Sequence, residues 1–323
     1  MRGIKIKTAM QSNEKNNSYF PIIDIIKAAA CIMIFLYHCN TILPDNWKFL
    51  TLLGQDMGNN FFFMVSGFAL AGSIDRTDWK GFPKWYFKRL IRILPITAIA
   101  YTGSYFMGFY SFADMSQIIT VFIYPTLYWF VSAILLYYII LFILAKTANE
   151  KVLFIIETAL FVLFVIFSER LERLYIIGLI AMIMGYMVKK NIDKSEQSGK
   201  DIFIIFVLLG FFITKSFNIK YLTNILSDLC VLIAGASLLI IGQRNNERLS
   251  DFFSVRKPLK AVIKYVGGMA LPLYLVQSFC SGYIGYMISL SIPFPRSFLI
   301  NFLIVWGIGT ILYFISNIPM KFL

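Results

Sequence analysis

Three ionisable residues lie inside one apolar stretch near the start of the chain. Asp24, Lys27 and His38 are separated by three and eleven positions, and His38 is the only histidine of the 323 residues. An α-helix turns about 100° per residue, so eleven steps leave a remainder of about 20°. The three side chains therefore lie on one narrow stripe, together with Cys31. Ionisable groups at membrane depth are costly, so this alignment predicts a functional site.

The residue types indicate what this stripe can do. An imidazole with an ordinary pKa of about 6.5 is the usual general base at neutral pH. Since the chain has one histidine, any histidine-dependent reaction must use His38. We predict that His38, Asp24 and Lys27 are catalytic, with Asp24 orienting Lys27. A simpler interpretation stays open, in which Asp24 and Lys27 neutralise each other at a helix end and His38 reaches the far interface.

A second motif places two arginines on one helix face. Arg89 and Arg92 are three positions apart, just before an apolar segment that opens at Pro95, and residues with this spacing are neighbours on a helix. Two guanidinium forks side by side suit phosphate groups. Taken alone, the pair is also explained as ordinary positive charge at the cytoplasmic surface, in contact with lipid headgroups.

Other polar and aromatic side chains lie within apolar segments and are candidates for binding a substrate. Packing also explains Ser66 beside Gly67, since small residues let helices approach closely. An interfacial aromatic belt also explains Trp129. Pro272 is expected to bend its helix and to free a carbonyl inside the membrane. The candidates for substrate binding are Ser66, Asn60, Trp129 and Gln277.

The composition is that of a polytopic membrane protein. Hydrophobic residues make up 59% of the chain and the mean hydropathy is +0.73, more than a soluble protein of this size needs. The net charge of +13 does not indicate a nucleic-acid partner, because the charges lie in short loops between apolar segments. No metal site or disulfide framework is expected, because no CxxC or metal-ligand spacing is present among the four cysteines, Cys31, Cys39, Cys230 and Cys280.

The hydropathy pattern predicts an all-α integral membrane protein with about ten transmembrane helices. The cytoplasmic segments of this arrangement hold 23 of the 30 lysines and arginines and the outer loops hold 6, which predicts that both the N-terminus and the C-terminus are cytoplasmic. Residues 1–18 are predicted to be a cytoplasmic tail, and a basic loop is expected between residues 244 and 264. The predicted spans are Tyr19–Asn40, Gln55–Ile74, Ile93–Phe112, Leu127–Ala145, Val152–Phe167, Leu174–Val188, Ile202–Thr214, Leu222–Ile241, Tyr265–Ile288 and Ser297–Ile315.

Taken in order, these motifs resemble the membrane-bound acyltransferase type 3 family. Its first span carries Asp-x-x-Arg/Lys, ten residues and then His, which Asp24, Lys27 and His38 match. The resemblance extends over nearly all of residues 1–323 as a single membrane domain. The other matching positions are Phe62, Phe63, Ser66, Gly67 and Phe68 for the family's Phe-Phe-x-x-Ser-Gly-Phe/Tyr run, and Arg89, Arg92 and Pro95 for its Arg-x-x-Arg element.

The chain departs from the family pattern at two positions. Gln277 stands where many members have a second histidine, and Asn60 stands where many have an aspartate. A glutamine cannot act as a base, so the resemblance does not imply a mechanism with two histidines here. Neither difference affects His38.

The resemblance implies transfer of an acyl group, usually acetyl from acetyl-CoA, to a sugar hydroxyl. Acyl-CoA would be a co-substrate with no permanently bound cofactor, and its phosphates would be held by Arg89, Arg92 and Lys27. The other expected partners are membrane lipids and a cell-surface, exported or lipid-linked glycan, and the expected location is the inner (plasma) membrane. A competing interpretation is a transporter or flippase for an anionic or glycan-linked substrate, which would also use a charged stripe and a broken helix.

Overall fold

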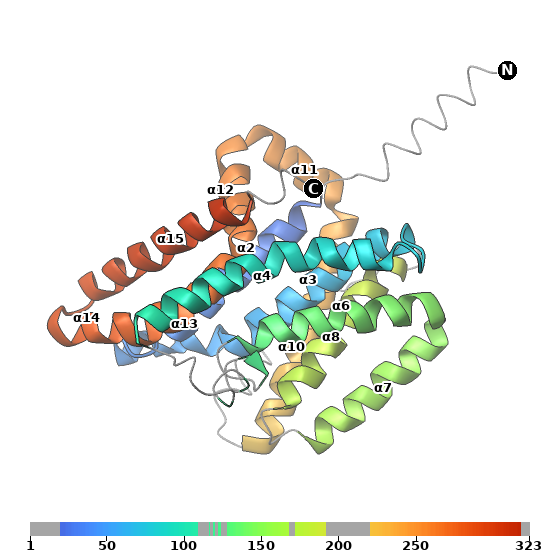
Figure 1. Ribbon diagram of the computed structural model, residues 1–323, viewed down its shortest axis with the longest axis horizontal. Coiled ribbons are helices and arrows are strands. Elements are labelled where there is room, and N and C mark those ends of the chain that lie inside the picture. Colours follow the sequence, from blue (N-terminus) through green and yellow to red (C-terminus); the bar gives the residue numbers. More distant parts are fainter. Residues whose placement is uncertain are drawn as a thin grey trace.

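The computed structural model describes residues 20–108, 116, 119, 122–123, 128–167, 172–191 and 220–317. All regular elements among these residues are helices, and they form a bundle (Figure 1). In chain order they are α2 Pro21–His38, the 3₁₀ helix η2 Asp45–Leu53, α3 Gln55–Asp75, α4 Phe82–Phe106, α6 Trp129–Thr147, α7 Glu150–Ile166, α8 Arg173–Asn191, α10 Lys220–Arg244, α11 Asn246–Val255, α12 Lys257–Gly268, α13 Ala270–Phe279, the π-helical segment η4 Cys280–Ile284, α14 Gly285–Ser291 and α15 Arg296–Ser316.

The helices confirm the all-α membrane architecture. Within the described part of the chain, five helices are long and apolar enough to cross a membrane, and a bent pair, α12 with α13, adds a sixth. The total of ten spans and the cytoplasmic position of both termini stay predictions. The predicted span Ile202–Thr214 and the tail 1–18 lie outside the described residues. The helices that qualify singly are α2, α6, α8, residues Ile225–Arg244 of α10, and α15.

The helix that carries the polar stripe lies in the middle of this bundle. α2 packs against α3, α10, α12 and α13. It begins with Pro21, where the missing N–H costs nothing because the first helical N–H groups have no partner in any case. A Cβ at Gly58 of α3 would collide with the side chain of Ile34 on α2. Close packing therefore fixes α2 along its length.

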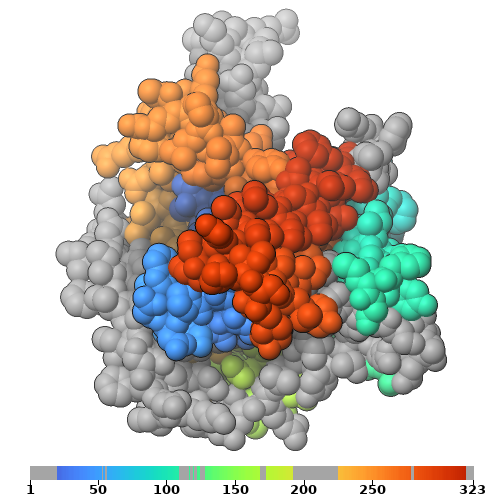
Figure 2. Space-filling model, turned by 90° about the vertical axis from the view of Figure 1, so that its left-hand side faces the viewer, coloured from blue at the N-terminus to red at the C-terminus, as the bar shows by residue number. Residues whose placement is uncertain are grey.

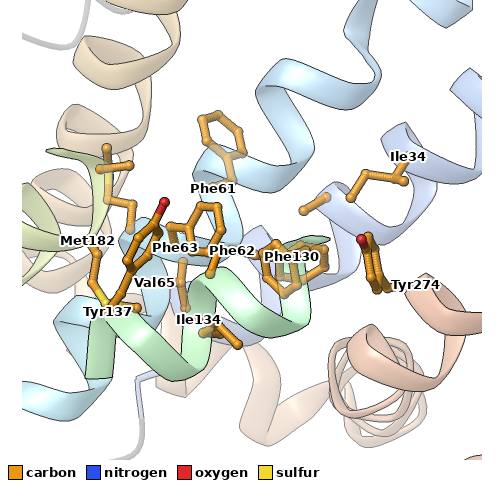
Figure 3. Close-up of a cluster of buried hydrophobic side chains, with 14 of the residues drawn as sticks. Ile34, Phe61, Phe62, Phe63, Val65, Phe130, Ile134, Tyr137, Met182 and Tyr274 are labelled. Atoms are coloured by element: carbon orange, nitrogen blue, oxygen red, sulfur yellow. The ribbon is translucent and has the colours of Figure 1, made fainter. Parts of the chain in front are cut away.

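Glycines also set the distance between α3 and α8. A Cβ on Gly67 would overlap the carbonyl oxygen of Met182, and a Cβ on Gly185 would overlap the carbonyl oxygen of Met64. The two backbones thus touch at reciprocal positions, the type of contact that small residues allow between membrane helices. Next to this contact, Phe63 packs its ring 4.5 Å from Phe130 (Figure 3).

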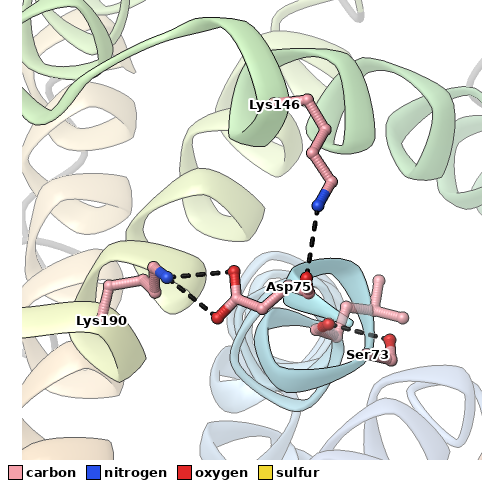
Figure 4. A network of polar contacts seen from close by, with 5 residues as sticks. Ser73, Asp75, Lys146 and Lys190 are labelled. Carbon is pink, nitrogen blue, oxygen red and sulfur yellow. Dashed lines mark hydrogen bonds and ion pairs between the residues drawn. The ribbon is translucent and has the colours of Figure 1, made fainter. Parts of the chain in front are cut away.

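One end of the bundle is tied by a polar network. Lys190 at the end of α8 donates to both carboxylate oxygens of Asp75 at 3.0 and 2.9 Å, and Lys146 of α6 donates to the Asp75 carbonyl at 3.4 Å (Figure 4). These contacts hold the C-terminal ends of α3, α6 and α8 together. Arg89 and Arg92 lie near the same end, because Arg89 bonds to Ser73, two residues before Asp75.

The predicted start of the helix in the third span is wrong. Pro95 was expected in a first helical turn, but α4 begins at Phe82 and continues through Pro95 in its interior. A proline there leaves one carbonyl without its helical N–H donor, and membrane helices tolerate this where neighbours supply other partners. Arg89 and Arg92 therefore lie in the same helix as Pro95.

The predicted ninth span, Tyr265–Ile288, is interrupted. α12 and α13 meet at Met269 with a bend of 53°. Pro272 does not cause this bend, because it lies in the first turn of α13, where the absent N–H needs no partner. The π-helical segment Cys280–Ile284 separates α13 from α14. The expected basic loop between residues 244 and 264 is also wrong, since α11 and α12 occupy nearly all of it.

Candidate active site

The polar stripe of α2 begins next to the paired arginines of α4. Asp24 and Lys27 are half-buried, and Cys31 is buried. The ammonium group of Lys27 interacts electrostatically with the carboxylate of Asp24 and with the guanidinium group of Arg92. Two motifs that are far apart in the sequence therefore lie within electrostatic range of each other at one end of the bundle.

Arg89 is held by its own helix and by α3. Its Nη1 donates to the carbonyl of Trp85 at 2.6 Å, and its Nη2 donates to Ser73 Oγ at 3.0 Å. The guanidinium carbon lies 3.5 Å from the centre of the Trp85 ring, a cation–π contact. Nε is buried and has no hydrogen-bonding partner among the described residues. Arg89 is thus fixed in position, and its Nε–H is one of the donors that remain for a ligand.

A tyrosine and a serine complete this group. The hydroxyl of Tyr138 on α6 interacts electrostatically with Arg92 and Arg89, and Ser66 of α3 lies beside it. Arg92 is exposed. Four helices, α2, α3, α4 and α6, therefore contribute to one group that we call the basic cluster, which consists of Lys27, Ser66, Arg89, Arg92 and Tyr138.

The basic cluster is suited to an anionic ligand. It holds three cations, and within the described ranges Asp24 supplies the carboxylate that interacts with Lys27. Guanidinium groups present paired N–H donors that match phosphate oxygens. The hydroxyl groups of Ser66 and Tyr138 add neutral hydrogen-bonding groups beside the cations. This arrangement favours binding of a phosphate-bearing molecule at this end of the bundle.

His38 lies at the opposite end of α2. It is the last residue of the helix, is half-buried, and packs its ring edge-to-face against Tyr37 with centroids 5.3 Å apart. Among the described residues, none hydrogen-bonds to the imidazole. Eleven residues of helix separate it from Lys27, or about 16 Å at 1.5 Å per residue. The structure thus places His38 apart from the basic cluster, on the same helix.

The residue after His38 belongs to a buried polar group. Asn301 of α15 donates through Nδ2 to Cys39 Sγ at 3.4 Å and to Ser281 Oγ at 3.1 Å. All three side chains are fully buried, and Ser281 lies in the π-helical segment, a local distortion that often marks functional sites. We call Cys39, Ser281 and Asn301 the neutral cluster. It ties the end of α2, and with it His38, to α15 and η4.

The other predicted binding residues do not join either cluster. Asn60 is buried near the start of α3, and Gln277 is buried in α13 with Oε1 lacking a partner among the described residues. Trp129 packs against Tyr175 with ring centroids 5.3 Å apart, which is the contact of a packing residue. Among the described residues, none of the three hydrogen-bonds to His38. No group of three potential metal ligands occurs in the described ranges.

Several residues of the two clusters carry weak sequence signals. Tyr138 lies in an aromatic run that sequence alone presents as core, and Asn301 is a single polar residue in an apolar segment. Trp85 and Arg89 are four positions apart, a spacing that brings two side chains together on a helix. That spacing is the one sequence signal for the contact between Trp85 and Arg89. The second partner of Arg89, Ser73, lies on another helix and has no such signal.

The architecture and the basic cluster define the class of this protein, a multi-pass helical membrane protein with a cationic site. The model of the acyltransferase type 3 family, described as an acyltransferase domain, matches residues 20–319. The chain belongs to this family, and the predicted resemblance is confirmed over nearly its whole length. Family membership makes it a membrane acyltransferase. No curated protein and no solved structure matches the chain.

Proposed function

We propose that the protein is an integral-membrane O-acyltransferase that moves an acyl group from acyl-CoA to a hydroxyl of a cell-surface or exported glycan. The acyl group that we propose is acetyl. The observation that carries this proposal is the basic cluster, in which Lys27 of α2 and Arg92 of α4 lie within electrostatic range of each other. A membrane acyltransferase needs a place for a donor that carries several phosphates, and this cluster has the chemistry for it.

The donor would extend along α2. Lys27, Arg89 and Arg92 would bind the phosphates of the nucleotide at the cytoplasmic end, and the pantetheine arm would extend the roughly 16 Å to His38. An acceptor that arrives from the membrane or from the outer side would then meet the thioester near His38. This geometry lets a cytoplasmic donor serve a glycan, or a lipid-linked glycan, on the far side of the membrane.

The proposed reaction is a direct transfer. His38 removes the proton from the acceptor hydroxyl, and the oxygen attacks the thioester carbonyl carbon. The carbon–sulfur bond breaks, the electron pair leaves with the CoA sulfur, and the imidazolium returns the proton to that thiolate. Asp24 orients Lys27, whose positive charge serves the donor. Asn60 and Gln277 are candidates for stabilising the oxyanion, and Ser66 and Trp129 are candidates for contacting the substrate.

The proposal also covers location and partners. The protein would act in the inner (plasma) membrane, with acyl-CoA as co-substrate and without a permanently bound cofactor. Mass spectrometry of surface polysaccharide from cells with and without the protein tests this directly. The expected result is a mass difference of one acyl group per modified sugar. Identical glycans in both samples, with no CoA released in vesicles that contain the protein, would contradict the proposal.

A second candidate function is transport of an anionic or glycan-linked substrate. The break of 53° between α12 and α13 is the observation that favours it, because broken helices line the substrate sites of many transporters. Vesicles that contain the protein distinguish the two functions. Substrate movement in the absence of any acyl-CoA would support transport.

A further inference from the structure

α12 has an exposed apolar face and an exposed basic face. Leu259 and Val262 are 42% and 57% exposed. Lys257 and Lys264 are exposed as well, and at about 100° per residue they project from the side of the helix opposite to Leu259. A helix with these two faces is stable neither in water nor in the bilayer core, and is typical of the membrane–water interface.

α11 extends the same character. Phe252 and Val255 are exposed apolar side chains, and the guanidinium carbon of Arg256 lies 4.0 Å from the centre of the Phe252 ring. α11 and α12 form a hairpin that stands at one end of the molecule (Figures 1 and 2). The hairpin thus combines an apolar surface with several cations at its margin.

The hairpin lies against the start of α2, beside the basic cluster. A Cβ on Gly267 of α12 would come within 3.0 Å of the Asp24 carbonyl oxygen and 3.4 Å of Lys27 Cβ. Cys31 Sγ donates to the carbonyl of Val266 at 3.7 Å. α12 then leaves the direction of the buried helix α13 by 53°. It therefore does not continue the line of α13 at the end of the bundle where the cations gather.

We propose that the α11–α12 hairpin lies in the membrane interface on the side of the basic cluster, and that Lys257 and Lys264 bind the headgroups of anionic phospholipids. The apolar face then enters the acyl chains, and each lysine meets a negative charge at headgroup level. The two lysines are seven residues apart, about 10 Å along the helix, so each can hold a headgroup of its own. A soluble nucleotide on this surface would leave Leu259 and Val262 in water.

Lipid retention by the full-length protein tests the charged face. The protein is purified in nanodiscs that contain phosphatidylglycerol and phosphatidylcholine, and the bound lipids are counted by native mass spectrometry. Lys257→Gln with Lys264→Gln should retain phosphatidylglycerol about 30-fold more weakly, at about 1 kcal/mol for each lysine. The matched control, Lys80→Gln with Lys84→Gln, removes two exposed lysines next to and within the start of α4 and should retain it as the wild type does.

The outcomes of this measurement decide the proposal. Equal loss in the two double variants would show that net charge alone matters, and it would overturn a site on α12. Unchanged retention in the α12 variant would also overturn it, as would competition by free CoA in place of lipid. Circular dichroism establishes that each variant keeps its helices.

Labels on the two faces test the apolar face independently. A spin label at Leu259→Cys should be relaxed mainly by oxygen, which concentrates in the acyl chains. A label at Ala261→Cys, an exposed position roughly 200° away on the helix, should be relaxed mainly by a water-soluble nickel chelate. Equal access of the chelate to both labels would place α12 in water and refute the interfacial position.

Discussion

The two ends of α2 place polar groups inside a helix bundle in opposite ways. The basic cluster gathers three cations and two hydroxyl groups, and Arg92 stays exposed. The neutral cluster at the other end has no charge, is fully buried, and pairs an amide with a thiol and a hydroxyl. The same helix thus has a solvated, charged end and a dry, uncharged end.

This difference suggests separate roles for the two ends of α2: the charged end binds a ligand and the uncharged end positions the helix. Cations that remain partly solvated can exchange water for the phosphates of a ligand at little cost, whereas a buried charge without a partner would be expensive. Buried neutral groups that bond to each other cannot be released for a ligand as easily, so they fix the backbone instead. We therefore expect changes at the basic cluster to alter donor binding and changes at the neutral cluster to alter turnover and stability.

The largest expected effect comes from removing the imidazole. His38→Ala should lower turnover by about 10²- to 10⁴-fold, because that is the usual contribution of a general base. Acyl-CoA binding should stay unchanged, since the basic cluster lies about 16 Å away. Acyl transfer in proteoliposomes and equilibrium binding of a CoA analogue measure the two quantities. Wild-type turnover in the variant would remove His38 from the mechanism.

A smaller effect is expected at the charged end. Arg92→Ala should raise the KM for acyl-CoA by about tenfold or more, because a hydrogen bond to a charged group contributes about 1.5–3 kcal/mol. Turnover at saturating donor should stay close to that of the wild type. Lys88→Ala is the matched control, an exposed cation four residues earlier on α4. An equal rise of KM in both variants would show that general positive charge is sufficient and that no specific site is present.

The neutral cluster offers the complementary test. Asn301→Ala removes the bonds to Cys39 and Ser281, which should lower the free energy of unfolding by about 1–3 kcal/mol. Turnover should fall while the KM for acyl-CoA stays the same, because the end of α2 loses its support. Asn317→Ala, at the exposed end of α15, should change neither quantity. A raised KM for acyl-CoA in Asn301→Ala would contradict the assignment of donor binding to the basic cluster alone.

The smallest effect concerns the hydroxyl that joins α6 to the basic cluster. Tyr138→Phe keeps the ring and loses the hydroxyl that interacts with Arg92 and Arg89, so the KM for acyl-CoA should rise by about fivefold, equivalent to about 1 kcal/mol. Tyr137→Phe removes a bond to the Tyr175 carbonyl instead. It should lower stability and leave KM unchanged. The opposite pattern would place the donor site elsewhere on α6.

Helical periodicity made part of this arrangement predictable. The common stripe of Asp24, Lys27 and His38 and the shared face of Arg89 and Arg92 follow from local spacing, and the structure has both segments as helices. The roles of these residues stay predictions. Hydropathy likewise indicated a helical membrane protein. It could not predict that the helix continues through Pro95 but breaks at Met269, because packing against neighbouring helices determines whether a membrane helix continues or breaks.

Contacts between distant segments could not be predicted. The bond between Asn301 and Cys39 joins residues 262 positions apart, and no local pattern marks either residue. Ser66 of α3 lies beside the hydroxyl of Tyr138 on α6, although each residue alone is explained by packing. Such pairs depend on which helices become neighbours, and a single sequence does not contain that information.

The reciprocal glycine contact has a consequence for how the protein is made. α3 approaches its most extensive neighbour, α8, most closely at Gly67 and Gly185, where each glycine faces the backbone of the other helix. In a bilayer, such close packing replaces the hydrophobic effect as the force that joins helices. The ribosome completes α2, α3 and α4 long before α8 is synthesised. Until then, α3 is in the bilayer without its main packing partner. A chain that stops before α8 should therefore be inserted but remain open to proteases and quality control.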